Sequence, residues 1–166
     1  MLQPLARRTW APRGRTPVHH VWDRHERLSV IAALILSPAR RRIGLNFQIH
    51  QRNVKAETVA AFLRDLHRHR PGPLTLVCDR YSVHQKAVRL IRETGGDWLS
   101  VEWLPAYAPE LNPVEALWSH AKYSELANFI PDDIDHLYDV VNETLNDQSF
   151  RSDLKRACFN WAKLTI

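Results

Sequence analysis

The sequence predicts a single α/β domain over residues 1–166, in which helices cover a mixed sheet. Three observations predict it: two successive strand-like segments, then helical and strand-like segments in alternation, and a series of helical segments at the end. A hairpin followed by strand–helix alternation gives a sheet with both antiparallel and parallel neighbours. Of the 166 residues, 45% are hydrophobic and 25% are charged, which excludes disordered and collagen-like chains.

The first two elements are strands that form a hairpin. Residues 28–36 are a near-continuous apolar run, which is typical of a strand buried on both faces. Apolar and more polar residues alternate along 43–49, so the second strand has one face in water. The connection between the strands, at 40–42, consists of three arginines.

The later elements alternate between the two periodicities. Apolar residues recur at helical spacing in most of these segments, and two short apolar runs between them have the length of strands. Asn112 is expected to cap a helix, with Pro113 at the first helical position, where its missing N–H costs nothing. The expected elements are helices at 55–69 and 83–91, strands at 74–78 and 101–104, and helices from 113, at 134–145 and at 149–162.

Positive charge is concentrated in the first part of the chain. The formal net charge is +5, but residues 1–70 hold 14 Lys and Arg against 4 Asp and Glu, whereas residues 71–166 hold 9 against 14. A basic block commonly binds a polyanion, because each phosphate that it neutralises releases counterions. A solvated surface is the alternative. The candidates for DNA phosphate contacts are Arg7, Arg8, Arg13, Arg15, Arg40, Arg41 and Arg42.

The cysteines and the hydropathy pattern exclude several classes of protein. Cys78 and Cys158 have no CxxC spacing for zinc and cannot form a disulfide framework, so a reduced, cytoplasmic setting is expected. The longest apolar run, 30–36, is too short to cross a membrane, and we expect no signal peptide. Gly-rich phosphate loops, GxSxG and HExxH motifs are missing from the sequence.

Two carboxylates are placed where a site could form. Asp79 follows the strand at 74–78, and ligands of open α/β sheets bind at the carboxyl ends of strands. The alternative is an aspartate that turns the chain into the next helix. Glu115 lies three residues after Asn112, where it could face the same crevice, but a capping-box partner of Asn112 is the alternative. His84 is expected to be structural or solvated.

Two sequence blocks resemble those of DDE transposases. Residues 76–84, LVCDRYSVH, resemble the block around the second catalytic acid of that family. Residues 104–118, LPAYAPELNPVEALW, resemble the block around the third acid, and this pattern is long, contiguous and unusual. Residues 8–14, RTWAPRG, resemble a further segment. The likeness covers nearly the whole chain and is greatest to the bacterial insertion-sequence branch of the mariner superfamily.

The resemblance implies an RNase H-like fold and a transposase activity. Such enzymes cut double-stranded DNA at the ends of the element and join the free 3′-hydroxyl to target DNA, with function expected at the bacterial nucleoid. Three carboxylates hold two Mg²⁺ or Mn²⁺ ions in these sites. Asp79 matches the second acid and Glu115 the third, so both are expected to be catalytic, metal-binding residues.

The family's first acid has no match in the sequence. In relatives it belongs to an Asp-Glu pair on the central strand, shortly before the segment matched by 8–14, whereas Asp23 and Glu26 come after that segment. The expectation is therefore an N-terminally truncated domain without the first strand and without the helix-turn-helix domain. The strands at 28–36 and 74–78 would each lack a neighbour. A mis-assigned start, a frameshifted pair of frames and a decayed element all explain this pattern.

Three functions are consistent with these observations. The first is a DDE transposase catalytic domain, truncated in this form. The second is a non-catalytic DNA-binding remnant that retains the basic half. The third is another RNase H-like nuclease with no preference for element ends. The helices after residue 130 either cover the sheet or contact a second subunit of a homodimer, and the sequence leaves both open.

Overall fold

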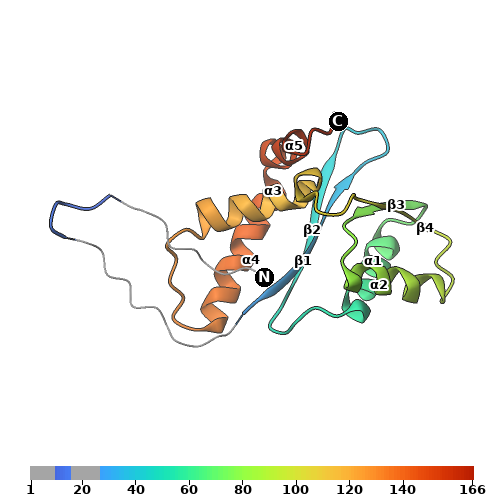
Figure 1. The fold of residues 1–166 in the computed structure, drawn as a ribbon, viewed down its shortest axis with the longest axis horizontal. Helices are drawn as coiled ribbons and strands as arrows, with labels where there is room; N and C mark the ends of the chain where they lie inside the picture. Colours follow the sequence, from blue (N-terminus) through green and yellow to red (C-terminus); the bar gives the residue numbers. More distant parts are fainter. Residues whose placement is uncertain (1–9, 16–26) are drawn as a thin grey trace.

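The computed structural model describes residues 10–15 and 27–166, so that Arg7, Arg8, Asp23 and Glu26 lie outside the described residues. Strands and helices follow one another as the sequence predicts, and the fold is a mixed α/β arrangement (Figure 1). The elements are β1 (Ser29–Leu36), β2 (Ile43–His50), α1 (Ala56–His69), β3 (Leu74–Cys78), α2 (Ser82–Arg92), β4 (Leu99–Trp103), a 3₁₀ turn (Pro109–Leu111), α3 (Pro113–His120), a π turn (Ala121–Glu125), α4 (Ile134–Phe150) and α5 (Ser152–Trp161).

Strands β1 and β2 form the expected antiparallel hairpin. The register places Ser29 opposite His50 and Leu36 opposite Ile43. The backbone N–H of Arg42 donates to the Ser37 hydroxyl at 3.0 Å and closes the connection. The three arginines therefore lie at the tip of a hairpin, as predicted.

Strands β3 and β4 form a parallel pair joined by α2. Leu74 lies opposite Leu99, and Cys78 lies opposite Trp103. The two carboxyl ends consequently meet at one edge, where Asp79 follows β3. Parallel strands need a crossover connection, and α2 provides it.

The two strand pairs are separate two-stranded sheets under one helix. One apolar cluster contains Phe62 and Leu63 of α1 and reaches Ile31 of β1 as well as Leu74 and Leu76 of β3. The two pairs thus share the layer that α1 covers. Within the described residues, β1 pairs with β2 alone and β3 pairs with β4 alone. Strands β1 and β3 therefore each keep one unpaired edge.

The opposite face of the hairpin is covered by the C-terminal helices. Val141 and Leu145 of α4 are fully buried in a cluster that includes Phe47 and Ile49 of β2. Leu154 and Cys158 of α5 pack against the same hairpin through Leu45. Of the two roles left open for the helices after residue 130, covering the sheet is the one that the fold shows.

Two details of the hairpin differ from the sequence expectation or refine it. The polar face of β2 is half-buried rather than open to water, because Arg70 at the end of α1 reaches across to Asn46 at 3.3 Å. Strand β1 has helices on both faces, as predicted, yet its residues after Ser29 are only half-buried. One unpaired edge accounts for that exposure.

The other boundaries lie close to the predicted ones. Strand β4 begins at Leu99, two residues early, because Leu99 is buried in the core and the preceding Trp98 stacks on His67 at 4.1 Å. Helix α3 passes into the π turn instead of ending. In the part of the chain that the structure describes, every helix is too short or too polar to cross a membrane.

Candidate functional site

Asp79 turns the chain out of β3 and also keeps an oxygen free. Its Oδ1 accepts a hydrogen bond from the backbone N–H of Tyr81 at 3.0 Å and lies 2.7 Å from Nδ1 of His84. Its Oδ2 takes no hydrogen bond from the described residues. The turning role considered from the sequence is therefore present, and it leaves half of an exposed carboxylate available to a ligand.

His84 contacts Asp79, a pairing that the sequence analysis did not predict. A carboxylate only accepts hydrogen bonds, so the 2.7 Å contact places a proton on Nδ1 of His84, which donates to Asp79. The ring also meets the ring of Tyr81 edge-on, at 5.7 Å between centroids. The signal was the five-residue spacing, which carries the chain from a strand end into the first turn of α2.

Glu115 lies in the first turn of α3 and is not a capping-box partner. The side chain of Asn112 caps the helix by accepting from the N–H of Val114 at 3.3 Å. The N–H of Asn112, which a capping box would give to Glu115, donates instead to the carbonyl of Pro109 at 3.0 Å. Glu115 is half-buried without a side-chain partner in the described ranges. A carboxylate that loses water without gaining a partner is costly, which favours a ligand-binding role.

A backbone hydrogen bond links the segment that leads to Glu115 with the strand that leads to Asp79. The N–H of Leu104 donates to the carbonyl of Cys78 at 2.9 Å, directly after the end of β4. The loop that reaches α3 therefore begins beside the residue preceding Asp79. Among the described residues, however, no three His, Cys, Asp or Glu side chains gather into a metal-binding group.

Cys78, next to Asp79, is a protonated thiol at neutral pH. Burial, and then the negative charge of Asp79, raise the pKa of Cys78 to about 11. Only the thiolate is strongly nucleophilic, so this side chain is chemically quiet.

The pKa of Cys78 predicts the pH dependence of its alkylation. In a Cys158→Ala background without metal ions, the rate with iodoacetamide should rise with a midpoint near pH 11, because the thiol loses its proton only there. An exposed cysteine made by Ser100→Cys on β4, in a chain with Cys78→Ser, is the control and should show an ordinary midpoint. Equal midpoints for the two thiols would refute the pKa assignment.

Of the arginines predicted to touch DNA, those that the structure describes do not form one patch. Arg40, Arg41 and Arg42 are exposed at the tip of the hairpin, and Arg40 has a positive φ of 56°. Residues 10–15, which carry the exposed Arg13 and Arg15, lie at the other end of the molecule (Figure 1). Arg7 and Arg8 are outside the described residues. The hairpin tip is thus the one compact group among the described candidates.

Comparison with known proteins identifies the family. The model of the DDE superfamily endonuclease family matches residues 1–138, which include Asp79 and Glu115. None of the curated proteins matches the chain. Members of this family act on DNA and generally use divalent metal ions. On the extent of this match, the chain belongs to the DDE superfamily endonucleases.

Proposed function

We propose that the chain is the catalytic domain of an insertion-sequence transposase, in which Asp79 and Glu115 hold divalent metal ions at the DNA phosphate that is cut. The observation that carries the proposal is the hydrogen bond between Leu104 and Cys78, which starts the path to Glu115 beside Asp79. Both carboxylates have oxygens without partners in the described residues. Their only donor atoms are oxygens, which hard cations such as Mg²⁺ and Mn²⁺ prefer.

The carboxylate oxygens of Asp79 and Glu115 suit such ions, but the site needs a third carboxylate. We infer that a third carboxylate enters on a strand that pairs with the open edges of β1 and β3. Ile31 and Leu76 on these strands pack under the same helix, α1, so a strand between them would extend one layer. Val77 of β3 is 54% exposed on the face away from α1, and an added strand would help to cover it. The lack of a match to the family's first acid in the sequence is consistent with this arrangement.

The residues of this chain have distinct tasks in the proposed site. Asp79 and Glu115 bind and orient, and His84 fixes Asp79 by holding one of its oxygens. Divalent ions held by these carboxylates would supply charge stabilisation for both the attacking and the leaving oxygen. Asn112 and Pro113 fix the first turn of α3, which sets the position of Glu115.

Metal-dependent nicking tests the proposal. The chain, alone and extended at its N-terminus by a strand-like segment that ends in Asp-Glu, is incubated with supercoiled plasmid carrying element ends, with Mg²⁺ or with EDTA. We expect nicking at the element ends only with Mg²⁺, and chiefly from the extended chain. DNA binding without nicking in either form would instead support the non-catalytic remnant, and nicking without preference for element ends would support the other nuclease.

His84 is expected to act as a positioning residue for Asp79. Replacing it by Ala should weaken Mn²⁺ binding by about 10- to 100-fold, as is typical when a hydrogen-bond partner of a metal ligand is removed. His84→Asn keeps a donor near the position of Nδ1 and should recover much of the affinity. A titration followed by electron paramagnetic resonance measures both variants. If His84→Ala binds Mn²⁺ as tightly as His84→Asn and the unmodified chain do, the His84 hydrogen bond does not orient Asp79.

The hairpin tip is expected to bind DNA phosphates. The variant Arg40→Asn, Arg41→Ala, Arg42→Ala uses Asn where φ is positive, since Asn tolerates that conformation. Losing three phosphate contacts should reduce the slope of log affinity against log salt by about 2.7 for duplex DNA. Replacing all three by Lys keeps the charge and is the control. An unchanged slope in the neutral variant would exclude the tip from the DNA interface.

A further inference from the structure

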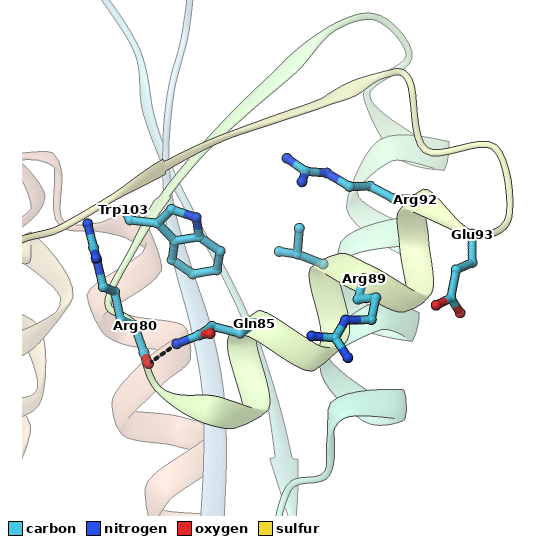
Figure 2. Close-up of a pocket in the computed structure, with 7 residues that line it drawn as sticks. Arg80, Gln85, Arg89, Arg92, Glu93 and Trp103 are labelled. Carbon is cyan, nitrogen blue, oxygen red and sulfur yellow. Dashed lines mark hydrogen bonds between the residues drawn. The ribbon is translucent and has the colours of Figure 1, made fainter.

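A second basic site lies on the α2 side of β4, close to Asp79. Helix α2 and the end of β4 line an open hollow of about 590 Å³ (Figure 2). Gln85, Val88, Arg89 and Arg92 recur at helical spacing and present one side of α2 to it. The complete lining is Arg80, Gln85, Val88, Arg89, Arg92, Glu93 and Trp103.

The hollow carries uncompensated positive charge. The guanidinium groups of Arg80, Arg89 and Arg92 are exposed and make no hydrogen bond or ion pair with the described residues. The side chain of Gln85 donates to the backbone carbonyl of Arg80 at 2.7 Å and so holds the chain there. The single acid of the lining, Glu93, lies at the far end from Arg80 (Figure 2). Three arginines against one glutamate favour an anionic ligand.

Trp103 adds an aromatic surface to this charge. Leu99 and Val101 of β4 point into the apolar core under α1 and α2, and Trp103, two residues on, continues the same face beyond the core. Its indole is half-buried and lies between Arg80 and the side of α2 (Figure 2). An aromatic ring beside several guanidinium groups is the combination with which proteins bind single-stranded nucleic acid.

We infer that this hollow binds a single DNA strand, with its phosphates on Arg80, Arg89 and Arg92 and an unpaired base stacked on Trp103. The inference rests on the proposed function, since Arg80 directly follows Asp79 and the strand would flank the phosphate that is cut. Bases within a duplex are stacked on one another, so only an unpaired base can cover the ring. The hollow is thus a site for a strand separated at the point of cleavage.

The contacts between the arginines and phosphates are tested by DNA binding in EDTA, where metal-dependent cleavage cannot occur. A labelled oligothymidylate of about 12 nucleotides is titrated with the chain and followed by fluorescence anisotropy. Arg89→Ala with Arg92→Ala should reduce the salt slope by about 1.4, the value for two phosphates of a single strand. Arg156→Ala with Lys163→Asn removes the same charge at exposed positions on or next to α5 and is the control, with Asn at Lys163 because its φ is positive, at 58°. Equal slopes in the two double variants would overturn the inference.

The stacking part is tested at Trp103. Trp103→Leu should weaken binding of the oligothymidylate about 5- to 100-fold but leave an abasic strand of the same length unaffected. Trp103→Phe keeps an aromatic face, so it should retain most of the affinity, and circular dichroism of both variants checks that each is folded. If Leu weakens both strands equally, the ring does not stack on a base.

Two competitors distinguish a single DNA strand from duplex DNA and from a free nucleotide as the ligand of the hollow. Unlabelled duplex and thymidine monophosphate should compete poorly with the single strand. Equal competition by the duplex would overturn the single-strand assignment, and strong competition by the nucleotide would identify a small-ligand site instead. If the binding tests fail, the result of the metal-dependent nicking assay is unaffected. If the chain does not nick DNA, the binding measured in EDTA is still valid. The two proposals can therefore fail independently.

Discussion

Glu115→Gln will abolish metal-dependent DNA cleavage and leave the fold intact. The loss of activity should be at least about 100-fold, because changes to residues that only support a metal ligand already cost 10- to 100-fold. Gln has nearly the same shape, and Glu115 has no partner among the described residues whose loss would destabilise the helix. The charge of Glu115 is half-buried but lies in the first turn of α3, where the helix dipole favours it, so its removal should change the free energy of unfolding by less than about 1 kcal/mol.

The control for this prediction is Glu110→Gln. Glu110 is an exposed acid in the same loop, in the 3₁₀ turn before α3, and its replacement should leave cleavage unchanged. Both variants should bind element-end DNA like the unmodified chain, as judged by gel shift in EDTA. Cleavage that persists in Glu115→Gln would remove Glu115 from the site. A fall in stability of several kcal/mol would assign it a structural role instead.

Leu117→Ala will strongly destabilise the fold and will also displace the candidate site. Leu117 is fully buried and packs with Leu45 of β2 and with Leu154 and Cys158 of α5. Deleting a buried Leu side chain typically costs about 2–5 kcal/mol, since the cavity that it leaves closes only in part. Leu117 lies two residues after Glu115, so a shift of α3 moves the carboxylate as well.

Urea denaturation followed by circular dichroism measures the loss in Leu117→Ala. Leu164→Ala is the matched control, because Leu164 is exposed and its truncation should change the free energy of unfolding by less than about 0.5 kcal/mol. Cleavage by the fraction of Leu117→Ala that remains folded should also fall. A stability loss below about 1 kcal/mol would show that the hairpin and α5 do not anchor α3.

The strands and helices with long periodic patterns could be predicted from the sequence. In the hairpin β1–β2 and in helices α1 and α4, the hydrophobic period recurs several times. Local preference and core packing therefore favour the same structure there. The cap of α3 by Asn112 was equally predictable, because it depends on neighbouring residues alone. The arrangement of the strands as two separate pairs is a tertiary property, and only the family resemblance suggested a missing neighbour.

The site could be predicted in part. The two acids stand out because one follows a buried strand and the other starts a helix. The contact of His84 with Asp79 and the bond from Leu104 to Cys78 depend on how α2 and the loop after β4 return to β3. The half-buried polar face of β2 depends on Arg70, which comes from another element. Contacts of this kind follow from the packed fold and leave no periodicity in the sequence.

The most direct test of the account is a titration of the chain with Mn²⁺ followed by electron paramagnetic resonance. We propose that Asp79 and Glu115 hold ions at one shared site. Each of Asp79→Asn and Glu115→Gln should then weaken Mn²⁺ binding by at least about 10-fold, the lower end for changes around a metal ligand. The double variant should bind little worse than either single one, Mg²⁺ should compete, and Glu110→Gln should bind normally. Unchanged binding in both single variants, or losses that add up as for two independent sites, would contradict the account.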